Sequence, residues 1–499
     1  MSDKRVWGAG AGTAAKSAQS LFAAVGVLLV ATVLAHTASA AAPAPPGDAW
    51  FETFKKTATP EQLYSFLYAL PKGGDLHNHL TGAALSEWMW DAALAQEKPG
   101  YTYFTKVAIH NCVPYGSTNE FGVAPYLLLF RNLSAVNHAK LDDCQRGEYK
   151  RLQDLDAREK AGWLASLRLD QPSEGRNEFF GAHWQRMNDL FANPYWIVEI
   201  LQRNMEAFGR EGVAYLETEN SLNGYKKPDG TEFSLEEVAA IYRAHLASPE
   251  ARATGVEVRF NNSILRFAPN AEESLKFYYS VNDRYRDLFV GINMVGREDD
   301  DKGYPLRFLP TLRELRRKYP DINLSIHAGE VDEPNFHVRD TLLLGAKRIG
   351  HGVNLITDPD TMRLMRYGPY MVEINLISNL LLEYVKDYSQ HPFPEYLRLG
   401  IPVALSTDDR GMWDSNMTDE YFVAVREFNL SWSEVVKLGR NSLQYSFVDD
   451  PTKQRLLASY DKRVATFAQQ FSKQGVAALK GTKPVSYSFL CMHYKLCLQ

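Results

Sequence analysis

The sequence predicts an α/β fold: a (β/α)8 TIM barrel with an irregular, partly helical segment inserted after the first strand. Two observations support this prediction. Apolar, strand-like runs alternate with helical patterns from about residue 184 onward, as expected for βαβ units around a parallel sheet. Four of the runs end in polar residues and glycine, and in such barrels the chemistry gathers at the carboxyl ends of the strands.

Eight segments are candidate strands, and helical patterns separate them. The strands are expected at Gly74–His79, Val213–Glu219, Val256–Leu265, Phe289–Val295, Asn323–His327, Arg348–Leu355, Tyr370–Asn375 and Pro402–Ser406. The helices are expected at Ile197–Arg210, Ser234–Leu246, Ala271–Asp287, Leu309–Tyr319 and Pro334–Leu344. Eight such units predict a closed barrel. An open doubly wound sheet is the alternative, and the lack of a Gly-x-Gly-x-x-Gly turn after any strand disfavours it.

The N-terminus has the organisation of a cleaved secretory signal over residues 1–40. Lys4, Arg5 and Lys16 precede the apolar stretch Leu21–Ala35, and Ala38-Ser39-Ala40 offers small residues for cleavage. The apolar stretch is short for a bilayer span. We therefore expect a secreted or periplasmic protein with no stable membrane anchor after cleavage, and an uncleaved anchor is the alternative.

Further segments follow the signal. We expect a linker at 41–49, an N-terminal helix at 50–70, the barrel at 71–450 and a C-terminal helical extension at 451–499. The stretch from about 98 to 180 does not follow the barrel repeat and is the expected insertion.

Composition narrows the possible classes of protein. Hydrophobic residues make up 45% of the 499 residues, enough for a large core, and the net charge of −5 gives no support to nucleic-acid binding. Four cysteines fit an oxidising compartment. Of the three connectivities, we favour the two local pairs, Cys112 with Cys144 and Cys491 with Cys497.

Four residues are candidate ligands of one metal ion. His77 and His79 are two residues apart on a candidate strand, so both imidazoles point to the same side. His327 closes another strand, and Asp408 follows the apolar run Val403–Leu405. Three histidines and one aspartate suit a single zinc ion that keeps a position for water. No lysine ends the middle strands, which argues against a lysine-carbamate bridge and a second metal.

Three more residues are candidates for moving protons. Glu330 follows two small residues at the end of a strand, and a pocket that excludes water would raise its pKa toward neutrality. His351 lies between two glycines and is a candidate general base or water-orienting group. Asp409 is adjacent to Asp408, and neighbouring residues on a strand point to opposite sides, so the two aspartates are expected to divide their roles.

Taken together, these segments resemble the adenosine deaminase family of metal-dependent amidohydrolases over roughly residues 70–450. The signature consists of Asp75-Leu76-His77-Asn78-His79, His327-Ala328-Gly329-Glu330, Gly350-His351-Gly352 and Ser406-Thr407-Asp408-Asp409, in that order. Glu373–Asn379 is similar to the family's seventh-strand segment. The signal and the cysteine-bearing insertion are similar to the secreted branch, the adenosine deaminase-related growth factors. That branch commonly has a long N-terminal dimerisation segment, whereas here only about 30 residues lie between the linker and the first strand. A homodimer is therefore possible, but dimerisation through such a segment is uncertain.

The resemblance implies a function for each candidate. One zinc ion would be held by His77, His79, His327 and Asp408. Glu330 would donate a proton to the purine ring nitrogen next to the reacting carbon. His351 would orient the zinc-bound water and take a proton from it.

Substrate contacts are also implied by the resemblance. Asp409 would hydrogen-bond the attacking water or the purine's five-membered ring, and the backbone amide of Gly296 would meet the purine. Thr81 stands where the family often has an aspartate that contacts the ribose, and Arg410-Gly411 replaces a proline. Both departures are expected near the sugar end of the substrate.

The implied reaction is zinc-dependent hydrolytic deamination of adenosine or 2′-deoxyadenosine to inosine or 2′-deoxyinosine, with release of ammonia. One alternative keeps the fold but acts on adenine, a nucleotide or a methylated adenosine. A nucleotide would need a phosphate site, to which Arg297 and Arg410 are candidate contributors. A non-catalytic binding protein is the second alternative, and it would have lost a ligand or Glu330.

Overall fold

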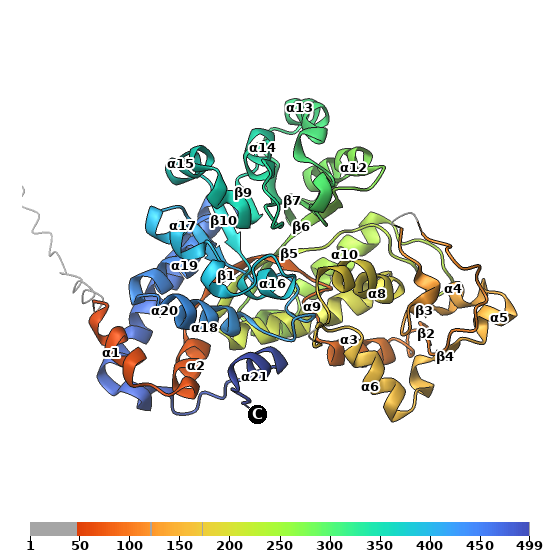
Figure 1. The fold of residues 1–499 in the computed structure, drawn as a ribbon, viewed down its shortest axis with the longest axis horizontal. Coiled ribbons are helices and arrows are strands. Elements are labelled where there is room, and N and C mark those ends of the chain that lie inside the picture. The colour runs from red at the N-terminus through yellow and green to blue at the C-terminus, as the bar shows by residue number, and fades with distance from the viewer. Residues whose placement is uncertain (1–46, 120–121, 172, 499) are drawn as a thin grey trace, which may run out of the picture. The chain divides into compact units, whose positions relative to one another are not determined.

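Eight parallel strands form one sheet that closes into a barrel, so the predicted fold class is confirmed (Figure 1). The computed structural model describes residues 47–119, 122–171 and 173–498; the expected signal peptide lies outside them. The strands follow the order β1-β5-β6-β7-β8-β9-β10-β11. Their bounds are β1 Gly73–His79, β5 Val213–Glu219, β6 Glu257–Leu265, β7 Phe289–Val295, β8 Asn323–Ala328, β9 Arg348–His351, β10 Met371–Ile374 and β11 Val403–Leu405.

One strand is shorter than predicted. The expectation of a strand over Arg348–Leu355 is wrong beyond His351, where β9 ends. Gly352 follows with a φ of 59°, in the left-handed region that favours glycine, and Val353–Thr357 forms a 3-10 turn. The chain therefore leaves the sheet directly after His351.

The barrel closes between its first and last strands. An isolated parallel bridge pairs Asn78 of β1 with Asp408, which follows β11. The carboxylate of Asp75 on β1 accepts hydrogen bonds from the backbone nitrogen of Thr407 at 3.2 Å and from its hydroxyl at 2.6 Å. These contacts join β1 to the segment that follows β11, where the two strands do not form a continuous series of backbone hydrogen bonds.

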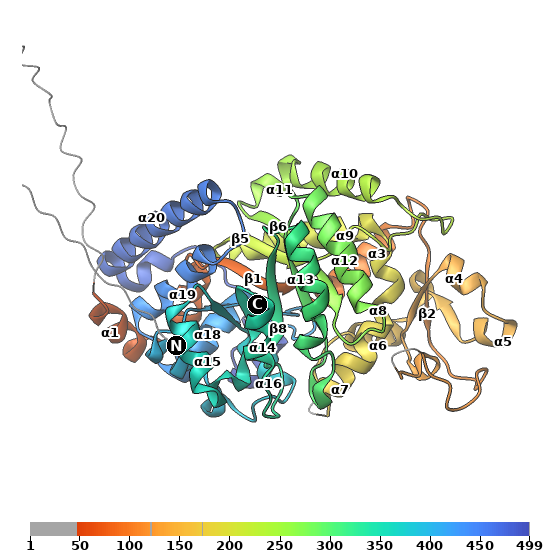
Figure 2. The same cartoon turned by 90° about the horizontal axis from the view of Figure 1, so that it is seen from above.

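Helices cover the outside of the barrel and alternate with the strands, as the sequence predicts (Figure 2). They are α9 Pro194–Arg210, α10 Leu235–Leu246, α11 Pro249–Ala253, α12 Ala271–Arg284, α13 Leu309–Lys318, α14 His337–Leu344, α15 Pro359–Tyr367, α16 Leu376–Leu381, α17 Phe393–Leu399, α18 Met417–Phe428, α19 Trp432–Gln444 and α20 Asp450–Gln474, followed by α21 Ser488–Tyr494. In the part of the chain that the structure describes, no helix combines the length and the apolarity that a membrane span requires.

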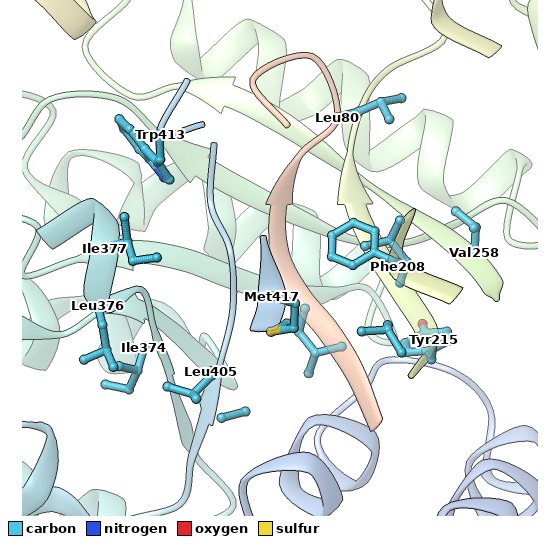
Figure 3. Close-up of a cluster of buried hydrophobic side chains, with 14 of the residues drawn as sticks. Leu80, Phe208, Tyr215, Val258, Ile374, Leu376, Ile377, Leu405, Trp413 and Met417 are labelled. Atoms are coloured by element: carbon cyan, nitrogen blue, oxygen red, sulfur yellow. The ribbon is translucent and has the colours of Figure 1, made fainter. Parts of the chain in front are cut away.

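The core packs apolar side chains of the strands against the helices (Figure 3). Ile374 of β10 and Leu405 of β11 are register partners, and both are buried. Leu376 and Ile377 of α16 lie beside Ile374. Burial of each such side chain contributes about 1.5–3 kcal/mol relative to exposure, so the core holds the strand ends in fixed positions.

The N-terminal region differs from its prediction. Instead of one helix over Trp50–Leu70, the chain forms α1 Ala49–Thr57 and α2 Pro60–Ala69. The hydroxyl of Thr59 caps α2 by accepting a hydrogen bond from Gln62 N at 3.2 Å. Pro60 has no N–H and cannot continue a preceding helix, but it fits the first turn of a new one.

The insertion also differs, because it contains a sheet. Three short antiparallel strands pair in the order β3-β2-β4, with bounds β2 Tyr103–Lys106, β3 Asn132–Ser134 and β4 Tyr149–Arg151. Both views place this sheet away from α20 (Figures 1 and 2). Its helices are α3 Ser86–Ala95, which precedes it, α4 Ala135–Ala139, α5 Asp143–Arg146, α6 Ala157–Ala165, α7 Arg176–Glu178, a π-helix at Phe179–His183 and α8 Trp184–Phe191.

Disulfides close one loop in the insertion and one near the C-terminus. Cys112 bonds Cys144, and Cys491 bonds Cys497, so the two predicted local pairs are confirmed. The first bond ties the loop after β2 to α5 and stabilises an insertion whose strands are only three or four residues long.

A buried lysine attaches α2 to the amino-terminal end of the barrel. Lys72 precedes β1 and is fully buried. Its ammonium donates to the carbonyl oxygens of Leu67, Leu70 (3.3 Å) and Glu211 (2.5 Å), with Tyr68 O at 3.4 Å. The last carbonyls of a helix lack a full set of intrahelical donors, and among the described residues Leu67 O accepts only from Leu70 N at 3.3 Å besides Lys72, so this side chain supplies a donor to buried carbonyls.

We therefore expect Lys72→Met to lower the free energy of unfolding by roughly 1–3 kcal/mol, because it leaves several buried carbonyls without a donor. Urea denaturation followed by circular dichroism measures the change. The exposed Lys56, on α1, provides the control variant Lys56→Met. Equal stability of the two variants would contradict this function of Lys72.

Candidate active site

The eight residues singled out from the sequence lie together at the carboxyl ends of the strands. A cavity of about 550 Å³ opens there. Six of the eight line it: His79, Gly296, His327, Glu330, Asp408 and Asp409. The other two, His77 and His351, are fully buried, and their ring centroids are 4.8 Å apart.

Three histidines turn the same ring nitrogen toward one point. Asp408 Oδ1 lies 3.3 Å from His77 Nε2 and 3.1 Å from His79 Nε2. His79 Nε2 lies 3.3 Å from His327 Nε2. His77 Nε2 is buried and lacks a hydrogen-bond partner among the described residues. Ligand atoms of His77, His79 and His327 lie within 4.8 Å of one another, as do those of His77, His327 and Asp408, so these residues could hold a divalent cation.

A second group holds the opposite nitrogen of each histidine. His77 Nδ1 lies 2.9 Å from Glu373 Oε2, His79 Nδ1 lies 3.0 Å from Glu219 Oε2, and His327 Nδ1 lies 2.9 Å from Asn293 Oδ1. The three acceptors come from β10, β5 and β7. Hydrogen bonds of this kind fix the tautomer and orientation of metal-binding histidines and raise their basicity. The outer partners therefore aim all three Nε2 atoms at the cluster.

The charges of this cluster couple cation binding to proton release. Burial would lower the pKa of His77, but the neighbouring carboxylates of Asp408 and Glu373 raise it to about 10. Burial likewise opposes the charge of Asp408, and His77 and His79 hold its pKa well below the usual range. In the absence of a cation, protons balance the carboxylates, and a cation that binds must displace them.

Glu330 is buried at the cavity wall and is suited to carry a proton. Burial raises its pKa well above the usual value, and the charges of Asp408 and Glu298 add to the effect. The Glu298 carboxylate accepts hydrogen bonds from Gly329 N at 3.2 Å and Glu330 N at 3.1 Å, which fixes the backbone here. The carboxyl group at this position can act as a general acid at neutral pH.

Two site residues adopt an unusual backbone conformation. His351 has a φ of 65° and Asp408 a φ of 54°, in a region that residues other than glycine rarely occupy. Such strain is maintained where the surrounding structure requires it, and it concentrates at functional sites. At Gly350, a Cβ atom would lie 2.6 Å from the His77 ring, so glycine permits the two histidine segments to approach.

Asp409 owes its position to a neighbouring glycine. A Cβ atom on Gly82 would lie only 1.6 Å from Asp409 Oδ1. That oxygen is buried and has no hydrogen-bond partner in the described part of the chain. Asp409 is one of the residues that line the cavity.

The rest of the cavity is aromatic and carries no positive side chain. Phe179, Phe180, Trp184 and Phe191 come from the end of the insertion, and polar side chains complete the lining. Among the described residues that line it there is no lysine or arginine. The cavity thus suits a flat, uncharged ligand.

Comparison with known proteins agrees with this geometry. Residues 170–463 match the family model described as adenosine deaminase. The chain belongs to the adenosine deaminase family. An adenosine deaminase from Aedes albopictus is 27% identical over 60% of this chain and 58% of its own length. The N6-methyl-AMP deaminase from Bos taurus is 25% identical over 54% of this chain and 77% of its own length.

A solved structure shares the fold of this family member. It is the adenine deaminase from Arthrobacter aurescens, with a TM-score of 0.56 and 19% identity, over 79% of this chain and 99% of that chain. The chain spans about half the length of the first curated relatives that it matches.

One expectation about the family departures is wrong. Thr81 lines the cavity, but Arg410 does not. The Arg410 guanidinium is fully buried, lies 2.9 Å from Glu211 Oε1 and stacks over the Phe208 ring at 4.3 Å. Arg297 is also engaged elsewhere, with Asp299 and with Asn177 at 2.8 Å. Neither arginine lines the cavity in this structure.

The groups that hold the metal-ligand candidates were not predicted. Glu219 and Asn293 were not singled out, and Glu373 was noted only within a segment similar to the family. The sequence did contain a signal for them: these charged or amide side chains lie within otherwise apolar strands. Such side chains are rarely buried without a partner, so each indicates a buried polar contact. Their partners, however, lie on distant strands and cannot be read from local spacing.

We expect Glu373→Gln to weaken binding of a divalent cation by about 10–100-fold, because His77 loses the charge that orients it and raises its basicity. Competition between the protein and a chromophoric chelator gives the affinity. The exposed Glu314 provides the control Glu314→Gln. Unchanged affinity in Glu373→Gln would show that His77 does not contribute a ligand.

Proposed function

We propose that the protein is a zinc-dependent aminohydrolase that converts adenosine and 2′-deoxyadenosine to inosine and 2′-deoxyinosine, with release of ammonia. The observation that carries this proposal is the juxtaposition of a three-histidine, one-aspartate cluster with a buried carboxyl group, Glu330, at one uncharged cavity. Membership of the adenosine deaminase family supports the reaction class.

Each residue contributes a separate step. His77, His79, His327 and Asp408 would hold the zinc ion, which supplies Lewis-acid activation of a water molecule. Glu330 gives its proton to the purine ring nitrogen next to the reacting carbon, which makes that carbon more electrophilic. The C–O bond then forms, the C–N bond breaks and ammonia leaves. His351 and Asp409 lie beside the metal-ligand candidates and are the residues that would handle the proton of the attacking water.

The cavity favours a nucleoside over a nucleotide. Four carboxylate residues line it, and no described lysine or arginine is there to meet a phosphate. A phosphate dianion would therefore lose its hydration and face like charges. A bare adenine would leave much of a 550 Å³ cavity unfilled. A neutral nucleoside satisfies both constraints, with its purine between the aromatic walls and the backbone at Gly296.

We further propose that the protein acts outside the cytoplasm, as in the secreted branch of the family. Two disulfides in the described residues support this location, since structural disulfides persist in oxidising compartments. The organisation of residues 1–40 is also consistent with export. The partner is then an extracellular or periplasmic purine nucleoside.

The direct test is ultraviolet absorbance of the purified protein with adenosine, where we expect a shift to the inosine spectrum that a strong chelator abolishes.

In Glu330→Gln, kcat should fall by about 10²–10⁴-fold, because the amide cannot donate the same proton. Zinc content should stay unchanged. Near-normal turnover in this variant, with Glu314→Gln as its control, would refute the function of Glu330.

Adenosine 5′-monophosphate should be a poor substrate, with kcat/KM at least about a hundredfold below that of adenosine, because the described lining of the cavity offers a buried phosphate no lysine or arginine. Initial rates of ammonia release from both compounds provide the comparison. 5′-O-methyladenosine, which adds bulk at the same oxygen without charge, is the control. A preference for the monophosphate would rule out the nucleoside assignment.

A further inference from the structure

We propose that His351 acts at this site as a hydrogen-bond donor through Nε2–H, and that His391 and Asn379 are positioning residues that fix this tautomer. The inference rests on the proposed function for its catalytic consequence, but the tautomer itself follows from the hydrogen-bond network. It replaces the general-base function that the family resemblance implies for His351.

The network starts at a donor whose direction is certain. The backbone nitrogen of Phe393 lies 3.1 Å from His391 Nδ1. A backbone N–H can only donate, so His391 Nδ1 accepts and carries no proton. A neutral imidazole has one proton, and in His391 it must be on Nε2.

That proton sets the orientation of the next side chain. His391 Nε2 lies 3.1 Å from Asn379 Oδ1. Because His391 Nε2–H donates, the Asn379 oxygen must face it, and the amide nitrogen must point the other way. The Asn379 Nδ2 group lies 3.0 Å from His351 Nδ1 and donates to it.

His351 therefore has its proton on the opposite nitrogen. The Asn375 amide nitrogen lies 3.4 Å from His351 Nδ1 and 3.5 Å from Nε2, so it does not distinguish the two ring nitrogens. The contact that distinguishes them is the hydrogen bond that Nδ1 accepts from Asn379. Hence Nε2 carries the proton, and it lies 3.8 Å from Glu330 Oε1 at the cavity. The His391, Asn379 and His351 side chains are 2% exposed or less, so bulk water cannot reverse the order of donors.

This tautomer decides which proton transfers His351 can perform. A general base needs a free lone pair on the nitrogen that faces the substrate, and Nε2–H has none. Nε2–H instead donates to the oxygen of the attacking water and stabilises the negative charge that develops there. The proton of that water passes to Asp409, whose Oδ1 has no other partner, and leaves with ammonia. Glu330 regains its proton from the new C–OH group as the carbonyl forms.

The tautomer can be observed directly in the zinc-loaded wild-type protein by 15N nuclear magnetic resonance with histidine labelled at both ring nitrogens. His351→Gln identifies the signals of His351 by their loss. We expect the proton of His351 on Nε2, with Nδ1 unprotonated and hydrogen-bonded. A proton on Nδ1 would overturn the proposal whether or not the protein deaminates adenosine.

Replacing the hydrogen-bond donor of Asn379 with an acceptor tests how the His351 tautomer affects catalysis. A carboxylate in Asn379→Asp can only accept, so it draws the His351 proton to Nδ1, which the same spectrum verifies. Asn379→Ala removes the link without imposing the wrong tautomer. We expect kcat to fall by about a hundredfold or more in Asn379→Asp, and by less in Asn379→Ala, at unchanged zinc content.

The opposite order would overturn the proposal, since a carboxylate behind a general base should preserve or raise its activity. Turnover in Asn379→Asp that equals or exceeds that in Asn379→Ala is therefore the contradicting result. Asn429→Asp makes the same chemical change at an exposed position, where Lys55 donates to the amide oxygen at 2.8 Å. If wild-type protein does not deaminate adenosine at all, the proposed function fails while the spectrum still decides the tautomer.

Discussion

The site depends on how the barrel closes. β1 and β11 are the first and last strands of the sheet, and they meet through two main-chain hydrogen bonds, from His79 N to Asp408 O at 3.2 Å and from Asp408 N to His77 O at 2.9 Å. These bonds join the two segments that supply three of the four metal-ligand candidates. Barrel closure and assembly of the ligand set are therefore one structural event. The Asp75–Thr407 contact holds the same seam.

Buried charged side chains connect the metal-ligand candidates to other strands of the barrel. Glu373, which holds His77, lies 2.6 Å from the guanidinium of Arg348, and that group lies 2.7 Å from Glu217. All three side chains are fully buried in an interior that such barrels usually fill with branched apolar residues. Each charge has a counter-charge, and removing one would leave another unpaired. Because an unpaired buried charge is strongly destabilising, substitution of Arg348 or Glu217 should also disturb Glu373 and, through it, His77.

Much of this organisation was predictable from local pattern, and the limits have physical causes. Strand positions and the metal-ligand candidates follow from periodicity and from polar residues at strand ends, such as the His77/His79 pair. The strands β2 to β4 are too short to show alternation, and the break at Pro60 lies within a continuous apolar periodicity. Arg410 follows the aspartate pair in sequence, but its guanidinium is buried beside Glu211, a partner that only the tertiary structure shows.

The charge balance of the cavity connects the metal to the choice of substrate. Glu219, Glu330, Asp408 and Asp409 line one cavity that has no described lysine or arginine in its wall. Buried like charges must be neutralised by protons or by a cation. Under the proposed function, a divalent cation at the histidine cluster balances Asp408, and a proton balances Glu330, whose pKa is raised. Under this proposal the described lining keeps no lysine or arginine for a phosphate, which favours an uncharged purine as the substrate.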